Sequence, residues 1–158
     1  MRSSPKRSPA SERWMPRPGA EPPGEGPAES IILDTSAYSH LRSGHPDVHH
    51  LLARSPVVYL PLIVIGELEA AFQQGTKLVE NRSRLAEFID EPFVHVVGVT
   101  RSMARRYGEL VDSLRRAGTP IPTNDIWIAA IASTVDGYIL TFDRDFERVP
   151  GIRCHVLA

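Results

Sequence analysis

The sequence contains one cysteine, Cys154, in 158 residues. A single thiol cannot form an internal disulfide, which excludes the small secreted scaffolds that disulfides hold together. A reducing cytoplasmic location is therefore the default expectation. We predict that Cys154, in a strand-like segment near the end of the chain, is a core residue and not a nucleophile.

Long hydrophobic runs are also missing. The longest, from Val57 to Ile65, is interrupted by Pro61 and is far shorter than the roughly 20 residues that a membrane helix requires. The basic residues near the N-terminus are not followed by an apolar segment, which argues against a secretory signal. We expect a soluble protein with no membrane partner.

Lysine is scarce, and the chain has almost no net charge. Only Lys6 and Lys77 are lysines among the 18 basic residues, and the formal net charge is -1. The total charge therefore does not indicate nucleic-acid binding, which would have to depend on local patches. The other basic residues are arginines, whose planar group can bind two phosphate oxygens at once.

The first 28 residues differ in composition from the rest. They hold seven of the 14 prolines and few apolar residues beyond Trp14 and Met15. This composition predicts a disordered tail over 1–28, followed by one domain over 30–158. The tail has three open interpretations: a solvated extension, an arm that binds a partner, or a wrong start codon with Met15 as the true beginning. In each case we expect it to be dispensable for chemistry.

From residue 30 onward, short β-branched runs alternate with helical periodicity. We predict strands at 30–34, 57–60, 93–99, 138–141 and 152–156, and helices at 48–54, 62–75, 77–89, 100–118 and 124–135. Strands that alternate with helices over this length predict an α/β fold with a mainly parallel central sheet and helices on both faces.

Four acidic residues occupy positions where such a sheet would bring them together. Asp34 ends the first strand and Asp143 follows the strand at 138–141, while Glu67 and Asp125 lie in otherwise apolar helices. Each alone could be a turn residue, a helix N-terminal residue or a solvated position. The functional crevice of a parallel sheet lies beyond the carboxyl ends of its strands, so we expect the four carboxylates to meet there.

Four converging carboxylates would need a cation to offset their repulsion. Oxygen ligands favour Mg²⁺ or Mn²⁺, and Mg²⁺ keeps several waters in a carboxylate site. One of these waters can become the hydroxide that attacks a phosphodiester, while the metal stabilises the charge on the phosphate oxygens. Because no other activated nucleophile is visible, the residues support metal-assisted hydrolysis.

Four segments, taken in order, resemble a known family. "ILDTS", "GELEAA", "NDIWIAAIA" and "ILTFDRDFERVPGIR" are similar to PIN domains, most closely to the VapC-type toxin ribonucleases of bacterial toxin–antitoxin pairs. The resemblance covers about residues 30–157. It places the acidic, metal-binding quartet of the family on Asp34, Glu67, Asp125 and Asp143.

The resemblance also implies a function and a three-layer PIN-like fold. It implies a Mg²⁺-dependent endoribonuclease that acts on tRNA, rRNA or mRNA, is silenced by a cognate antitoxin protein and often forms a homodimer. Ser36 and Thr141 fall at the hydroxyl positions beside the first and fourth acids. The tail is the main departure from the family pattern.

Two alternatives to a nuclease belong to other classes. A PIN-type module that binds RNA or a partner protein without cleavage would share the fold, although the presence of all four acids argues against it. A receiver domain or a phosphatase also places acids at strand ends. Both ordinarily need a lysine late in the sheet, and no lysine follows Lys77.

Some residues outside the acidic quartet could also contribute to RNA binding or to the site. Among the arginines that could touch an RNA backbone, Arg144 is singled out because it adjoins Asp143. Trp127 and Tyr107 could stack on bases, but their helical spacing favours core or dimer-interface packing. We expect Asp145 to turn toward the core and cap the turn that follows, without joining the site.

A run of histidines has helical spacing suited to a metal pair. His45, His49 and His50 lie close together in the sequence, with Asp47 as the one acid beside them. The lack of further acidic partners favours an ordinary surface position for these side chains.

Overall fold

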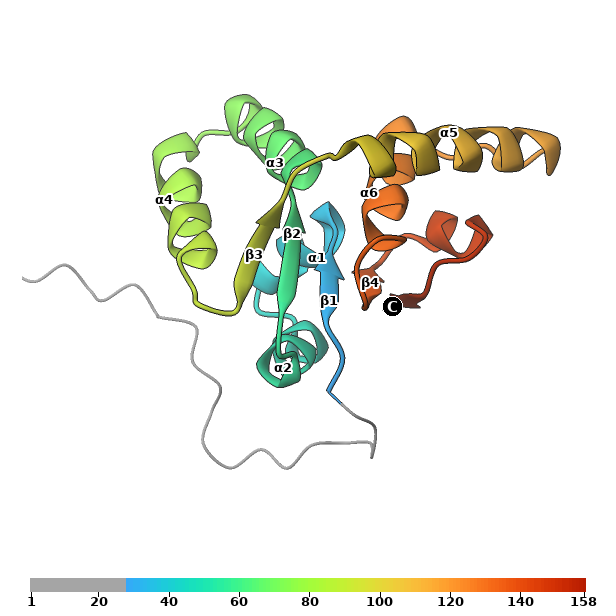
Figure 1. Cartoon of the computed structure of the whole chain (residues 1–158). Coiled ribbons are helices and arrows are strands. Elements are labelled where there is room, and N and C mark those ends of the chain that lie inside the picture. Colours follow the sequence, from blue (N-terminus) through green and yellow to red (C-terminus); the bar gives the residue numbers. More distant parts are fainter. Residues whose placement is uncertain (1–27) are drawn as a thin grey trace, which may run out of the picture.

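Five parallel strands form one sheet in the part of the chain that the structure describes (Figure 1). The computed structural model describes residues 28–158, so the tail expected at 1–28 lies, apart from Ala28, outside the described residues. The strand order is β3-β2-β1-β4-β5. The strands are β1 (Ile31–Leu33), β2 (Val58–Pro61), β3 (Val94–Val97), β4 (Tyr138–Thr141) and β5 (Cys154–Val156).

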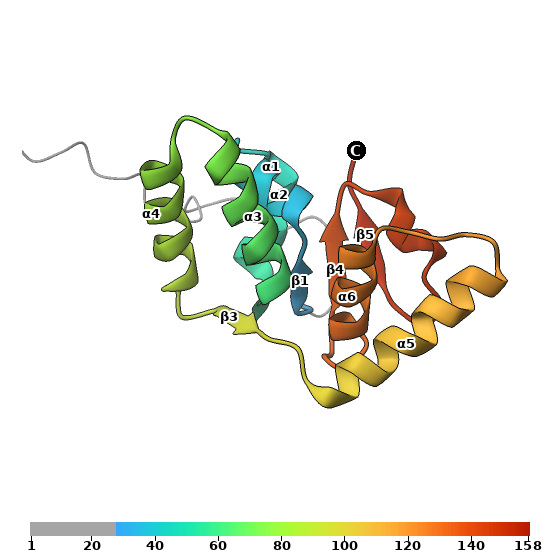
Figure 2. The ribbon, with the colours of Figure 1, turned by 90° about the horizontal axis from the view of Figure 1, so that it is seen from above.

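Helices cover both faces of this sheet, which gives the three layers that were expected (Figure 2). They are α1 (Thr35–Arg42), α2 (Pro46–Arg54), α3 (Leu62–Gln74), α4 (Leu78–Ile89), α5 (Arg101–Arg116), α6 (Thr123–Ala132) and the short 3-10 helix η1 (Arg144–Arg148). Among the residues described, no helix has both the length and the apolar character to cross a membrane.

The central strand β1 is the most enclosed part of the fold. Its three residues, Ile31, Ile32 and Leu33, are fully buried because β2 and β4 flank it and helices cover both faces. A strand enclosed in this way must be apolar along its whole length. Because this buried strand is fixed in the core, Asp34, the residue that follows it, is held at the carboxyl end of the sheet.

A second apolar cluster packs α5 and α6 against the segment that follows η1. Leu110 and Leu114 of α5 pack with Ile126 and Ala130 of α6, and Val149 joins them just after η1. The cluster therefore holds the start of α6 and the segment after β4 near each other.

The chain enters β1 at the edge of the sheet opposite to the carboxyl ends of the strands. There Glu29 forms an ion pair with Arg153, with 2.6 Å between Oε1 and Nη1. The Ser55 hydroxyl donates a hydrogen bond to the Glu29 carbonyl oxygen at 2.9 Å. These two contacts attach the beginning of the described chain to the domain.

All predicted strands are present, and their ends differ from the predicted ends by no more than two residues. Two helices were not predicted. α1 begins directly after Asp34, and η1 takes the place of the turn expected after Asp143. α1 begins two residues and η1 three residues after the last residue of a strand, and in such short segments a helical pattern does not stand out.

Candidate functional site

Asp34 is a buried carboxylate held by hydrogen bonds. It is 4% exposed, and its Oδ1 accepts from the backbone N–H of Ala37 at 2.8 Å, which caps α1. The Ser36 and Thr141 hydroxyls donate to its two oxygens at 2.8 and 2.5 Å. Burial raises the pKa of Asp34, these hydrogen bonds lower it, and the nearby charge of Asp143 raises it further, with a net upward shift.

The same two hydroxyls fasten the chain as it leaves β4. The Thr141 hydroxyl oxygen accepts from the Asp143 backbone N–H at 2.9 Å. The Ser36 hydroxyl oxygen accepts from the Phe142 backbone N–H at 3.0 Å. Ser36 and Thr141 therefore link the ends of β1 and β4 and set the position of Asp143 relative to Asp34.

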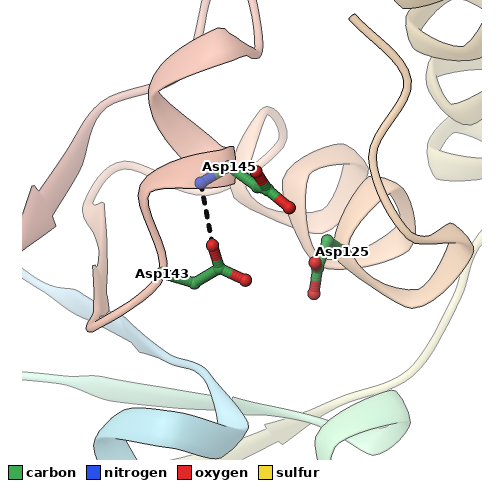
Figure 3. Close-up of side chains that lie close together, drawn as sticks. All are labelled: Asp125, Asp143 and Asp145. Atoms are coloured by element: carbon green, nitrogen blue, oxygen red, sulfur yellow. Dashed lines mark hydrogen bonds between the residues drawn. The ribbon is translucent and has the colours of Figure 1, made fainter.

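Three aspartates come together beyond β4, as Figure 3 shows. Carboxylate oxygens of Asp125, Asp143 and Asp145 lie within 4.8 Å of one another. Asp143 Oδ1 accepts from the Asp145 backbone N–H at 2.8 Å and so caps η1. The expectation that Asp145 is the cap and stays out of the site is wrong. Because η1 starts directly after Asp143, its first turn brings the Asp145 carboxylate back toward Asp125.

Burial and the nearby carboxylates both raise the pKa of Asp125. Its pKa is raised from 3.8 to about 7, first by burial and then by the charges of Asp143, Glu67, Asp34 and Asp145. The other three predicted acids therefore all lie near enough to Asp125 to raise its pKa, and Asp145 is a fourth such neighbour. Asp145 also forms an ion pair with Arg148, with 3.1 Å between Oδ1 and Nη1.

Glu67 reaches the site from α3 and is held by one hydrogen bond. The Thr35 hydroxyl donates to its Oε2 at 2.7 Å. Its other oxygen, Oε1, is buried and accepts no hydrogen bond within residues 28–158. Thr35 was not among the predicted site residues; the signal for it was its place between Asp34 and Ser36.

This set of groups fits a divalent cation. It offers carboxylate oxygens from several elements, which hard cations such as Mg²⁺ and Mn²⁺ prefer. Burial and the charges of neighbouring carboxylates raise the pKa of Asp125 to about 7, and a bound cation would offset these charges. The buried Glu67 Oε1 is an acceptor that a cation would satisfy.

Arg144 is exposed directly after Asp143 and forms no ion pair with any residue of the described chain.

The rings of Tyr107 and Trp127 stack with centroids 3.9 Å apart, between α5 and α6. That contact confirms the packing role expected of the aromatic pair.

The three histidines His45, His49 and His50 are partly exposed and partly buried, so they lie at the surface without being fully solvated. His49 Nε2 lies 3.0 Å from the Leu41 carbonyl oxygen, and the His45 ring packs edge-on against Phe142. The sharp turn from α1 to α2 folds these rings onto the domain. In the part of the chain that the structure describes, they are in no cluster of three or more metal-type ligands.

Comparison with known proteins places this geometry in context. The PIN domain model matches residues 31–152. Ribonuclease VapC1 of Haemophilus influenzae (strain R2866) is 28% identical over 129 residues, which cover 77% of this chain and 93% of the relative. Ribonuclease VapC4 of Mycobacterium tuberculosis is 29% identical over 91 residues, or 58% of this chain and 70% of the relative.

Solved structures show the same fold. The match to VapBC2 from Rickettsia felis, bound to a DNA fragment from its promoter, has a TM-score of 0.72 at 25% identity and covers 82% of this chain and 99% of that chain. The DNA-bound VapBC from Salmonella typhimurium matches with a TM-score of 0.70 at 23% identity, over 81% of this chain and 98% of that one. These matches confirm the resemblance inferred from the four segments.

Proposed function

The chain belongs to the PIN-domain family, and from that premise we propose that it is a divalent-metal-dependent endoribonuclease and the toxin of a toxin–antitoxin pair. The observation that carries the proposal is the cluster of Asp125, Asp143 and Asp145, whose carboxylate oxygens lie within 4.8 Å of one another. Asp34 and Glu67 support it, since burial and then the charges of these neighbouring acids raise the pKa of Asp125 to about 7. The ribonuclease names of the curated relatives support the choice of RNA as substrate.

The four acids would hold Mg²⁺ or Mn²⁺, with Asp145 as a further neighbour. When bound, the cation would supply a Lewis acid that activates water and offsets charge on the phosphodiester. Asp34 arrives with its orientation set by Ser36 and Thr141. Because the pKa of Asp125 is raised to about 7, first by burial, a cation would compete with a proton for this carboxylate near neutral pH.

Arg144 is proposed as a contact for the RNA backbone. It is exposed and adjoins Asp143, so its guanidinium is free to reach a phosphate beside the acids. A planar guanidinium can donate two hydrogen bonds to one phosphate, which fixes the substrate as well as attracting it.

We propose a cognate antitoxin protein as the natural inhibitor and the cytoplasm as the location. The support is the likeness to VapBC assemblies, one of which is described as a member of the VapBC family of toxin–antitoxin systems from Mycobacterium tuberculosis. The antitoxin would act by keeping RNA away from the acidic site.

We also propose a homodimer built on an apolar surface near the ends of β2 and β3. Leu62, Val96 and Val99 are 53%, 43% and 44% exposed. Pro61 pairs with Val97 in the sheet, so these three side chains belong to the same end of the two strands. Exposed apolar side chains gathered in this way are typical of protein interfaces.

The test is cleavage of RNA by the full-length chain with Mg²⁺, with EDTA, and with Asp125→Asn. We expect cleavage with Mg²⁺, none with EDTA and a strong loss in the variant. Cleavage undiminished by EDTA would contradict metal dependence. RNA binding without any cleavage would favour the non-catalytic PIN module. Expression in bacteria should arrest growth, and expression of Asp125→Asn should not.

A further inference from the structure

We infer that Thr35 is a positioning residue for Glu67: its hydroxyl holds one carboxylate oxygen of Glu67 and leaves the other to the cation. The inference rests on the proposed function, because it concerns the same site. It adds a residue that lies outside the acidic quartet and outside the two hydroxyl positions beside Asp34.

The contact joins two elements that are far apart in the sequence. Thr35 is the first residue of α1, and Glu67 lies in the middle of α3. The distance from Thr35 Oγ1 to Glu67 Oε2 is 2.7 Å, which is within the usual range for a hydroxyl–carboxylate hydrogen bond. Since an ionised carboxylate only accepts, the hydroxyl is the donor.

The two oxygens of Glu67 are in different surroundings as a result. Oε2 is occupied by Thr35, while Oε1 is buried and accepts no hydrogen bond from any other described residue. A buried acceptor without a donor is uncommon in folded proteins and indicates a missing partner. With the carboxylate held at Oε2, Oε1 is the atom available to a cation.

Thr35 is well placed for this role because its helix is rigidly fixed. Asp34 caps α1 through the Ala37 N–H, and the buried side chains of Ala37 and Leu41 anchor the helix in the core. The Ser36 hydroxyl joins the same turn to the backbone after β4. A flexible glutamate side chain is therefore oriented by a hydroxyl that cannot easily move.

Binding of Mn²⁺ to the full-length protein tests the inference without RNA. Thr35→Val removes the hydroxyl at nearly constant shape, and we expect about tenfold weaker Mn²⁺ binding, as for other groups that orient metal ligands. Thr35→Ser keeps the hydroxyl and should bind Mn²⁺ within about threefold of wild type. Ser39→Ala is the matched control, since this exposed hydroxyl of α1 bonds only to a helix carbonyl oxygen.

A double variant shows whether Thr35 acts through Glu67. In the Glu67→Ala background, which has no side-chain oxygen for Thr35 to hold, Thr35→Val should weaken Mn²⁺ binding no further. An equal additional loss in that background would overturn the inference, as would Mn²⁺ binding by Thr35→Val as tight as that of wild type. Circular dichroism checks folding, and Thr35→Ala removes the same hydroxyl if the valine variant does not fold.

The outcome for Thr35 can be separated from the outcome for the proposed function. If wild type binds Mn²⁺ and shows the Thr35 effects but cleaves no RNA, the ribonuclease proposal fails and the positioning role stands. If wild type cleaves RNA while Thr35→Val binds Mn²⁺ normally, the positioning role fails alone. If wild type binds no Mn²⁺, both are overturned.

Discussion

Asp143 combines two roles in one side chain, because it caps η1 and faces Asp125. Asp143→Asn keeps an oxygen that can accept from the Asp145 N–H but removes the charge, whereas Asp143→Ala removes both. We expect cleavage to fall by about 100-fold or more in each variant. We expect the alanine variant to be less stable than the asparagine variant by about 1 kcal/mol. Urea unfolding in EDTA measures the difference, and equal stabilities would show that the cap is unimportant.

Asp125 should make the metal-free protein less stable as the pH rises. Its pKa is raised from 3.8 to about 7 on folding, so the folded state binds this proton more tightly than the unfolded state does. The stability due to the proton is complete below about pH 3.8 and is lost as the pH rises through about 7. Asp125→Asn, which is always neutral, should therefore melt above wild type at about pH 8 and close to it at about pH 4.

Melting temperatures in EDTA across this pH range test the expectation. Asp90→Asn, which removes an exposed acid at the end of α4, is the control for the loss of one negative charge. A constant difference between Asp125→Asn and wild type at every pH would argue against the raised pKa.

Single residues differ in how far the sequence could predict them. Asp34 and Asp143 directly follow strands, so the parallel sheet predicted where their carboxylates would meet. Asp145 could not be placed, because its direction depends on the 3-10 turn that Asp143 starts. Thr35 could not be assigned either, since its partner lies 32 residues away on a different helix.

At the scale of elements, the parallel sheet was predictable and α1 was not. The apolar runs of the strands and the long periodicities of α3 and α5 are strong local signals. α1 spans eight residues, contains three serine or threonine residues and begins just after the strand, so its apolar pattern is limited to Ala37, Tyr38 and Leu41. Its stability comes from the Asp34 cap and from packing, which only the folded chain supplies.

The turn into β4 requires a glycine for reasons of space. A Cβ at Gly137 would lie 2.6 Å from the Ser30 carbonyl oxygen and 3.1 Å from the Ile32 side chain. Gly137→Ala should therefore destabilise the fold by about 1–3 kcal/mol. Gly108→Ala is the matched substitution in α5, where no atom would contact the new Cβ, and it should stabilise by about 0.5–1 kcal/mol. Thermal unfolding of both variants checks the contrast, and a neutral Gly137→Ala would contradict it.

At the scale of the whole molecule, the proposed homodimer predicts a selective effect of charge. Leu62→Arg places a cation in the apolar surface at the ends of β2 and β3 and should raise the dimer dissociation constant by about tenfold or more. Val79→Arg is the control, because Val79 is 82% exposed but lies on α4, away from that surface. Light scattering after gel filtration distinguishes the two variants. Equal dissociation constants for both, or a wild-type monomer, would refute the proposed interface.

The attachment of Glu29 to Arg153 and Ser55 has a practical consequence for work with this protein. The chain enters the domain at the edge of the sheet opposite to the acids, since all five strands run in the same direction. A fluorescent label, an affinity tag or a surface linker joined ahead of residue 28 would therefore start from the far side of the domain. A surface attached at residue 28 itself would therefore face away from the acidic side of the domain.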